Sequence, residues 1–320
     1  MSKYKVLLTD YAWPDIDIER DTLAEIDAEL LVADQTGPAS LAALVTDVDA
    51  IMTCWAQVTS QVIAAANRIQ IVSRLGIGLD NIDVDYCSRN GIPVTNIPDY
   101  CVIEVAEHAL SLLLSMARKI AFYHHATKSG EYDLQAGPPI WRIEGQTLGI
   151  IGLGNIGRRL ASKAQGLGMR VIAFDAYPGK PEEGVEFCEL DHLLASSDYV
   201  TLHVPLTEET HYLIGAAQLQ QMKSSAYLIN TARGGLVDPA ALAAALSDNQ
   251  LAGAALDVQD PEPPDLSIAP YTDPRVIVTP HAAFTSQESL IDLRSRVAVQ
   301  VATCLAGGTP ENVVNADALA

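Results

Sequence analysis

Short apolar runs alternate with longer stretches of helical periodicity through the first third of the chain. The apolar runs, which are typical of buried strands, cover residues 6–8, 50–53, 71–75 and 92–94. The stretches between them, for example 16–26 and 60–67, have the amphipathic spacing of helices. This alternation predicts βα units, and therefore a parallel sheet that helices cover on both faces.

A long helical pattern at 102–122 separates this region from a second series of the same kind. The predicted strands of that series are 148–151, 171–174, 199–202, 226–229, 254–256 and 276–278. A final helical pattern covers 286–305. We therefore predict an α/β chain with two parallel-sheet domains.

The length of the chain indicates the number of domains, and its charge excludes two kinds of partner. A length of 320 residues corresponds to about two domains at roughly 150 residues each. Lys and Arg number 20 against 40 Asp and Glu, which gives a formal net charge of −20. So acidic a chain is a poor candidate for sequence-independent nucleic-acid binding or for docking on an anionic membrane. We expect neither kind of partner.

The apolar runs and the cysteines indicate a location. No apolar run reaches the roughly 18 residues of a membrane span, and the apolar stretch near the N-terminus is too short for a signal peptide. The five cysteines are odd in number, widely spaced and without a Cys-x-x-Cys pair, which is typical of reduced thiols. These features predict a cytoplasmic protein.

A glycine motif lies between the strand predicted at 148–151 and the helical pattern that follows it. It consists of Gly152, Leu153, Gly154, Asn155, Ile156 and Gly157. The first glycine permits a tight turn, the second lets the backbone approach a pyrophosphate, and the third lets the helix pack against the strand. The helix N-terminus offers free N–H groups to the anion, and the surrounding residues 142–170 carry a net charge of +4. This context predicts a dinucleotide site.

Asp175 ends the next predicted strand, 18 residues after Gly157. An acid in this place is expected to bind the hydroxyls of the adenosine ribose. Because its carboxylate would repel a 2′-phosphate, we expect NAD (NADH) to be preferred over NADP.

Three polar residues, Arg233, Glu262 and His281, follow three successive predicted strands of the second series. Ligands of open α/β sheets bind outside the carboxyl ends of the strands. We therefore expect these side chains to meet where the nicotinamide would lie. Each residue alone has an ordinary structural interpretation, and it is the set that favours catalysis.

The residue types of this set suit the reduction of a 2-oxo acid. An imidazolium can protonate the carbonyl oxygen while a hydride adds to the carbon, and the neutral ring can take the proton back in the reverse direction. A carboxylate bonded to the imidazole orients it and favours its charged form. A guanidinium can hold the substrate carboxylate through two hydrogen bonds.

The other histidines have weaker functional signals. His108 lies inside a helical pattern, and we interpret it as structural. His203, at a strand end shortly before Pro205, is expected to line the adenine side of the cofactor site. No two histidines have the spacing of metal ligands on one helix, so we expect no metal.

Together these motifs resemble the D-isomer-specific 2-hydroxyacid dehydrogenases over nearly the whole chain. The segments that carry the resemblance are 152–157 with Asp175, 230–238, 253–258 and 279–281. The resemblance implies that Arg233 binds the substrate carboxylate, that His281 is the acid/base and that Glu262 is its partner. Arg233 and His281 would also stand beside the nicotinamide. The other residues implied to contact the cofactor are Asp257, at the carboxamide, and Thr231, Ala232 and Pro205.

The resemblance also implies a domain plan. The fold would consist of two Rossmann-like or flavodoxin-like domains, with a discontinuous outer substrate domain at 1–98 and 288–320 and an NAD-binding domain at 99–287. In the outer domain the backbone at Ile77 and Gly78 would meet the substrate carboxylate, and Arg74 could add positive charge there. A homodimer through the NAD-binding domains, with the helix at 102–122 in its interface, is implied as well.

Within the family, residues 98–108 and 281–283 are most similar to the branch of phosphoglycerate dehydrogenases and C-terminal-binding-protein corepressors. The corepressors have a tryptophan where this chain has Phe284. An aromatic wall for the substrate is kept there, but the indole N–H is lost. The identity of the 2-oxo acid therefore does not follow from the resemblance.

Two alternatives remain beside a dehydrogenase of small 2-hydroxy acids. One is an NAD(H)-sensing binding protein of the corepressor kind, with weak or residual dehydrogenase activity. The other is oxidation of formate or phosphite. The formate enzymes have a glutamine where this chain has Glu262, and the phosphite enzyme has a lysine at the position of Ile77, so the second alternative is disfavoured.

Overall fold

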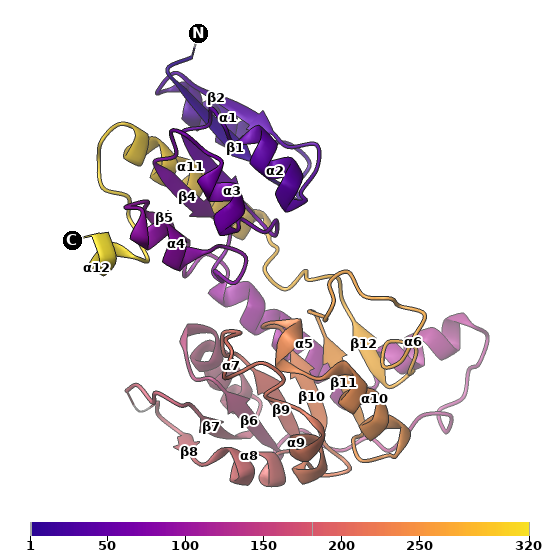
Figure 1. Cartoon of the computed structure of the whole chain (residues 1–320). Helices are drawn as coiled ribbons and strands as arrows, with labels where there is room; N and C mark the ends of the chain where they lie inside the picture. The colour runs from indigo at the N-terminus through magenta and orange to yellow at the C-terminus, as the bar shows by residue number, and fades with distance from the viewer. Residues whose placement is uncertain (1, 181, 320) are drawn as a thin grey trace. The chain divides into compact units, whose positions relative to one another are not determined.

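The chain divides into two units, each built around a parallel sheet (Figure 1). The computed structural model describes residues 2–180 and 182–319. Unit 1 consists of Met1–Tyr100 and Ser286–Ala320, and unit 2 of Cys101–Thr285. The predicted fold class is confirmed, with two parallel-sheet α/β domains, one of which is assembled from both ends of the chain.

Unit 1 has a five-stranded sheet in the order β2-β1-β3-β4-β5. Its strands are β1 (Tyr4–Leu8), β2 (Ala28–Val32), β3 (Ala50–Thr53), β4 (Ile71–Arg74) and β5 (Val94–Thr95). Its helices are α1 (Asp17–Ala24), α2 (Pro38–Leu44), α3 (Ser60–Ala64), α4 (Val84–Arg89), α11 (Gln287–Leu305) and α12 (Ala316–Leu319).

The residues of each central strand of unit 1 alternate between two apolar layers. On β1, Val6 and Leu8 pack in the layer that contains α1 and α11, whereas Leu7 packs with α2, α3 and α4. All three side chains are at most 1% exposed. This is the pattern of a sheet that helices cover on both faces, and it explains why the strand reads as a continuous apolar run.

A buried ion pair attaches the C-terminal helix α11 to α1. Arg294 donates from Nε to Glu19 Oε1 at 2.9 Å and from Nη2 to Glu19 Oε2 at 2.8 Å. The Glu19 side chain is fully buried, so leaving it without this guanidinium would be strongly destabilising. Nη2 also donates to the Asp15 carbonyl. The contact explains how the last long helix becomes part of the first unit.

Unit 2 has a seven-stranded parallel sheet in the order β12-β11-β10-β9-β6-β7-β8. Its strands are β6 (Thr147–Ile151), β7 (Arg170–Phe174), β8 (Val185–Phe187), β9 (Tyr199–Leu202), β10 (Tyr227–Asn230), β11 (Gly253–Leu256) and β12 (Val276–Val278). Its helices are α5 (Val102–Arg118), α6 (Ile120–Lys128), α7 (Asn155–Gly166), α8 (Leu190–Ser196), α9 (Ala216–Gln221), α10 (Pro239–Ser247) and the 3₁₀ turn η1 (Gly234–Leu236). Helices α5 and α7 share one apolar layer, and α8, α9 and α10 share the other.

The periodicity predicts a single helix at 102–122, but the structure has two helices there. Helix α5 ends at Arg118, Lys119 has a left-handed φ of 57°, and α6 begins at Ile120. A left-handed residue cannot continue a right-handed helix, so the axis breaks there. Two strands, β2 and β8, escaped prediction because none of their residues is fully buried.

The structure also shows whether any described helix could span a membrane. Within residues 2–180 and 182–319, no helix combines the length and the apolar character that crossing a bilayer requires.

Candidate active site

The glycine motif forms the turn between β6 and α7, and two of its glycines are required by packing. Gly152 has a φ of 95°, and a Cβ there would lie 2.7 Å from the His203 carbonyl oxygen. A Cβ on Gly157 would lie 2.3 Å from the Gly152 carbonyl oxygen. A Cβ on Gly154, by contrast, would meet nothing within 4 Å. The second glycine of the motif therefore borders open space at the start of α7, as the close approach of a pyrophosphate requires.

Asp175 lies just beyond β7 and holds the glycine turn. Its Oδ2 accepts a hydrogen bond from the Leu153 N–H at 2.9 Å, and its Oδ1 accepts from the Tyr177 N–H at 2.9 Å. The residue is half-buried. One carboxylate thus joins the turn after β6 to the loop after β7, where the sequence predicts the ribose site.

The end of β9 brings His203 against the same turn. Its Nε2 lies 2.9 Å from the Thr201 hydroxyl. Desolvation by burial lowers the pKa of His203 to about 4, so the ring is neutral near pH 7. Pro205, two residues further on, is exposed.

Thr231 and Ala232 follow β10. The Thr231 hydroxyl is buried and has no hydrogen-bond partner among the described residues. Such an orphaned group is uncommon in a folded protein, and a bound ligand is one thing that would satisfy it. The Ala232 N–H donates a hydrogen bond to Asn230 Oδ1 at 3.1 Å. Together with the open space at Gly154, the orphaned hydroxyl is consistent with a dinucleotide that contacts this edge of the sheet.

Arg233 lies in a tightly packed segment directly before η1. Asn230 Nδ2 donates to the Arg233 carbonyl at 2.8 Å, and Arg233 Nη1 donates to the Ala232 carbonyl at 2.7 Å. A Cβ on Gly234 would lie 1.8 Å from the Gln259 carbonyl oxygen, so this backbone is pressed against the segment that follows β11. The packing fixes the backbone from which the guanidinium projects.

His281 and Glu262 form a hydrogen-bonded pair. His281 Nδ1 lies 2.9 Å from Glu262 Oε1, and the two side chains are 19% and 36% exposed. The His281 ring also meets Phe284 edge-on, with the ring centroids 6.1 Å apart. The carboxylate and the aromatic ring together set the orientation of the imidazole.

The backbone of His281 is in an unusual conformation. Its φ is 52°, which is costly for a residue with a Cβ and persists only when the surroundings enforce it. The His281 N–H donates to the Asp257 carbonyl at 2.7 Å. The Asp257 carboxylate accepts from the Ala282 and Ala283 N–H groups, each at 2.9 Å. Asp257 therefore holds the turn immediately before and after the imidazole.

The predicted residues of the outer domain lie in unit 1, on the loop after β4. Arg74 is only 6% exposed, and its guanidinium contacts carbonyls of its own loop. Nε donates to the Gly78 carbonyl at 3.0 Å, and Nη1 donates to the Leu75 carbonyl. Asn96 Nδ2 donates to the Ile77 carbonyl at 2.7 Å. These contacts fix the course of the backbone at Ile77 and Gly78, both half-buried.

A second turn of unit 1 supports this loop. The Asp10 carboxylate accepts from the N–H groups of Cys54, Trp55 and Ala56 at 3.0, 2.7 and 3.2 Å. Asn81 Nδ2 in turn donates to the Ala56 carbonyl at 2.9 Å. The ends of β1, β3 and β4 are thus joined into one hydrogen-bonded assembly.

One residue of unit 2 that the sequence predicts to be structural, His108, contacts the Asp257 group. His108, on α5, places its Nε2 3.1 Å from the Thr279 hydroxyl and 3.4 Å from Asp257 Oδ1. The signal that could have drawn attention to it is its position at the end of the segment 98–108, which resembles the corepressor branch.

As for metals, no cluster of three or more His, Cys, Asp or Glu side chains in the described ranges could hold an ion.

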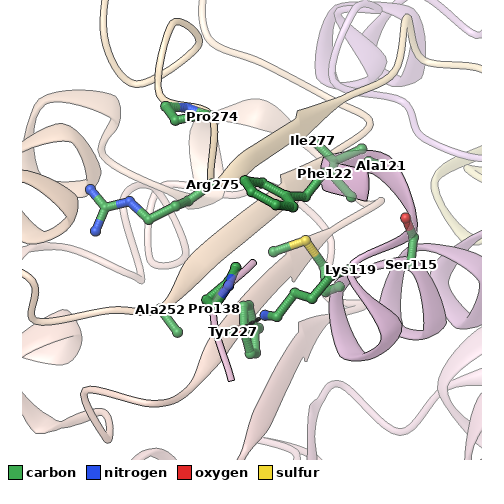
Figure 2. A pocket seen from close by; sticks show the side chains of 11 residues that line it. Ser115, Lys119, Ala121, Phe122, Pro138, Tyr227, Ala252, Pro274, Arg275 and Ile277 are labelled. Atoms are coloured by element: carbon green, nitrogen blue, oxygen red, sulfur yellow. Dashed lines mark hydrogen bonds between the residues drawn. The ribbon is translucent and has the colours of Figure 1, made fainter. Parts of the chain in front are cut away.

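Unit 2 also has a pocket of about 50 Å³ at the opposite edge of its sheet (Figure 2). It is lined by residues at the amino ends of strands, such as Tyr227 and Arg275, and by the end of α5. Figure 2 shows the Lys119 side chain reaching from α5 to the Tyr227 hydroxyl, with which it is hydrogen-bonded. Because ligands of such sheets bind at the carboxyl edge, this pocket is separate from the candidate active site.

Comparisons with known proteins agree with this geometry. The family model described as "D-isomer specific 2-hydroxyacid dehydrogenase, NAD binding domain" matches residues 110–283. A glyoxylate reductase of Korarchaeum cryptofilum is 38% identical over 85% of this chain and 84% of its own length. A glycerate dehydrogenase of Methylorubrum extorquens is 42% identical over 78% of this chain and 79% of its own. Two archaeal D-3-phosphoglycerate dehydrogenases are matched over only 50% of their length.

Among solved structures, a D-lactate dehydrogenase from Aquifex aeolicus, complexed with NAD and lactic acid, has a similar fold. Its TM-score is 0.85 at 28% identity, and the match covers 94% of this chain and 96% of that one. The likeness therefore extends over both units.

Proposed function

The chain belongs to the D-isomer-specific 2-hydroxyacid dehydrogenases, and we propose that it interconverts a small 2-oxo acid and its D-2-hydroxy acid with His281 as the acid/base. The NAD-dependent dehydrogenase activity follows from the family, whereas the roles of individual residues are our proposal. The observation that carries it is the His281–Glu262 pair, held at 2.9 Å on a strained turn at the carboxyl edge of the sheet.

In the direction of reduction, the imidazolium of His281 gives its proton to the carbonyl oxygen of the substrate. Glu262 accepts from Nδ1, which orients the ring and stabilises its positive charge. In the oxidation of the hydroxy acid, the neutral ring takes the hydroxyl proton back. The balance is 2-oxo acid plus NADH plus a proton, giving D-2-hydroxy acid plus NAD⁺.

Arg233 is proposed to hold the substrate carboxylate. Its guanidinium projects from a backbone that Asn230 clamps, and a planar fork of donors suits a carboxylate better than an ammonium does. We also propose that the backbone at Ile77 and Gly78, together with Arg74, serves the substrate carboxylate from unit 1. Phe284, which contacts the His281 ring, would form the aromatic wall beside the reacting carbon.

The bound cofactor would supply the hydride to the substrate carbon. Gly152, Gly154 and Gly157, with Asn155 and Ile156 between them, would hold its pyrophosphate at the start of α7. Further residues along the carboxyl edge are proposed to contact it, namely Asp175, His203, Pro205, Thr231, Ala232, Arg233, Asp257 and His281.

Asp175 favours NAD over NADP in this proposal. Its carboxylate can accept from the ribose hydroxyls and would repel a phosphate on the same ribose. We also propose a homodimer through unit 2, with α5 in its interface, and a cytoplasmic location, which agrees with five cysteines that are all free thiols.

One experiment tests the proposal as a whole. The wild type is assayed for oxidation of NADH, and separately of NADPH, with glyoxylate, hydroxypyruvate, pyruvate and phenylpyruvate. We expect turnover with NADH, preference for a small 2-oxo acid, and a loss of at least about 100-fold in kcat for His281→Ala, since general acid–base catalysis contributes roughly 10²–10⁴-fold. NADH binding, followed by fluorescence, should persist in that variant.

Two results would overturn it. Undiminished turnover of His281→Ala would remove His281 from the reaction. Absence of turnover by the wild type on every 2-oxo acid, together with tight NADH binding, would favour an NAD(H)-sensing binding protein instead.

A further inference from the structure

His108, on α5, contacts the hydrogen-bonded group around the Asp257 carboxylate. It lies on the helix between residues that face the apolar layer, including Ala106 and Ala109, and its side chain is 24% exposed. Its Nε2 lies 3.1 Å from the Thr279 hydroxyl and 3.4 Å from Asp257 Oδ1. The contact connects a core helix of unit 2 to the turn that carries His281.

The hydrogen bonds determine whether Nε2 of His108 carries a proton. The Thr279 hydroxyl has a single proton and donates it to Asp257 Oδ1 at 2.6 Å. Toward the imidazole the same oxygen can therefore only accept. Nε2 must carry the proton, which it donates to the Thr279 hydroxyl, with Asp257 Oδ1 3.4 Å away. His108 thus acts as a donor in both its neutral and its charged form.

The Asp257 carboxylate depends on such donors because it is fully buried. A buried carboxylate is tolerated only when hydrogen bonds or a cation compensate the loss of water. It accepts from the Thr279 hydroxyl and from the N–H groups of Ala282 and Ala283, and His108 Nε2 lies 3.4 Å from its Oδ1. These three donors belong to residues 279–283, whereas His108 belongs to α5, a different element. The contact therefore connects the carboxylate and the Thr279 hydroxyl to a core helix.

His281 needs this fixed point. Its left-handed backbone is enforced by bonds from Asp257 to both sides of it, and its ring must keep its place against Glu262. A displacement of about 1 Å in a reacting group can cost on the order of 100-fold in rate.

We propose that His108 is a positioning residue for the dehydrogenase reaction. It acts through the Thr279 hydroxyl and the Asp257 carboxylate to hold the His281 turn in its strained conformation. The inference rests on the proposed role of His281.

The test compares two substitutions of one residue. His108→Leu removes the donor and keeps a side chain of similar bulk, whereas His108→Gln keeps an N–H donor at the same number of bonds from Cα. We expect His108→Leu to lower kcat by about tenfold while KM for NADH changes by less than about twofold. His108→Gln should recover most of the lost kcat. His192→Leu, a change at an exposed histidine of α8, is the matched control and should behave as the wild type.

A double-mutant cycle separates positioning from general destabilisation. Thr279→Val removes the hydroxyl that His108 contacts. If both residues act through Asp257, His108→Leu combined with Thr279→Val should cost clearly less in kcat than the product of the single losses. Circular dichroism and the midpoint of thermal unfolding check that each variant is folded at the assay temperature.

Three results would overturn the proposal. They are a wild-type kcat in His108→Leu, an equal loss of kcat in His108→Leu and His108→Gln, and multiplicative losses in the double mutant. Failure of the proposed function would look different, because the wild type itself would then show no turnover or His281→Ala would be fully active.

Discussion

Asp10 in unit 1 and Asp257 in unit 2 each fix a nearby turn by accepting hydrogen bonds from its backbone N–H groups. The two turns carry different groups toward the proposed site. Asp10 accepts three backbone N–H groups, those of Cys54, Trp55 and Ala56. Asp257 accepts two, from Ala282 and Ala283, and the Thr279 hydroxyl. In both cases a carboxylate near the end of a parallel strand fixes a turn that belongs to another strand.

The difference lies in what each turn carries. The assembly in unit 1 leads to a loop whose predicted contribution is backbone, at Ile77 and Gly78, while the Arg74 guanidinium is bonded to carbonyls of that loop. The turn in unit 2 carries an ionisable side chain, His281, in a strained conformation. In the proposed mechanism, the same kind of contact would serve substrate binding in unit 1 and proton transfer in unit 2, so loss of each carboxylate should affect a different kinetic constant.

The largest effect is expected from Asp257→Asn. The amide has one acceptor oxygen where the carboxylate has two, so the N–H groups of Ala282 and Ala283 cannot both be satisfied as before. The strained turn should relax, and we expect kcat to fall by on the order of 100-fold with a small change in KM for the 2-oxo acid. Steady-state kinetics at saturating NADH measure both constants. A change confined to KM would contradict the division of labour between the two units.

A smaller effect, on KM instead of kcat, is expected from Asp10→Asn. The turn at 54–56 loses a charged acceptor, and the loop after β4 loses part of its support. We expect KM for the 2-oxo acid to rise by about tenfold, kcat to stay within about twofold, and the free energy of unfolding to fall by about 1–3 kcal/mol. The same assay and urea unfolding measure these quantities. A loss of kcat with unchanged KM would show that the turn in unit 1 serves the chemical step.

The smallest effect is a pH dependence of stability that involves His203. Burial lowers its pKa to about 4 from an ordinary 6.5, so between these pH values the unfolded chain binds a proton that the folded chain does not. Stability from this residue is therefore present above pH 6.5 and is lost as the pH falls toward 4. His203→Gln should show a shallower loss in urea unfolding over this range. His192→Gln is the exposed control, and equal slopes in the wild type and His203→Gln would refute the assignment.

The strands that are buried on both faces could be predicted from the sequence because each reads as a short run of mostly apolar residues. Strands β2 and β8 could not, since partial burial leaves polar residues among the apolar ones. The break at Lys119 was equally invisible, because lysine is a good helix former and only tertiary contacts hold it in a left-handed conformation.

For the site, residue types and their order after the strands predict Arg233, Glu262 and His281, and the structure brings Glu262 and His281 into contact. The contacts of the supporting residues could not be predicted, because hydrogen bonds between distant segments leave no periodic signal. Arg74 illustrates this, since the sequence cannot tell a guanidinium offered to a ligand from one bonded to carbonyls of its own loop. His108 illustrates it as well, because its partners lie about 150 residues or more away in the chain.

The double role of Asp175 limits how readily the cofactor specificity of this fold can be redesigned. The carboxylate that would exclude a phosphate from the ribose also accepts the Leu153 N–H inside the glycine turn. A substitution that makes room for the phosphate removes this acceptor from the turn that we propose binds the pyrophosphate. A successful change of specificity would thus require a second substitution that supplies a new acceptor, so that variants with one change would pass through a less well-formed site.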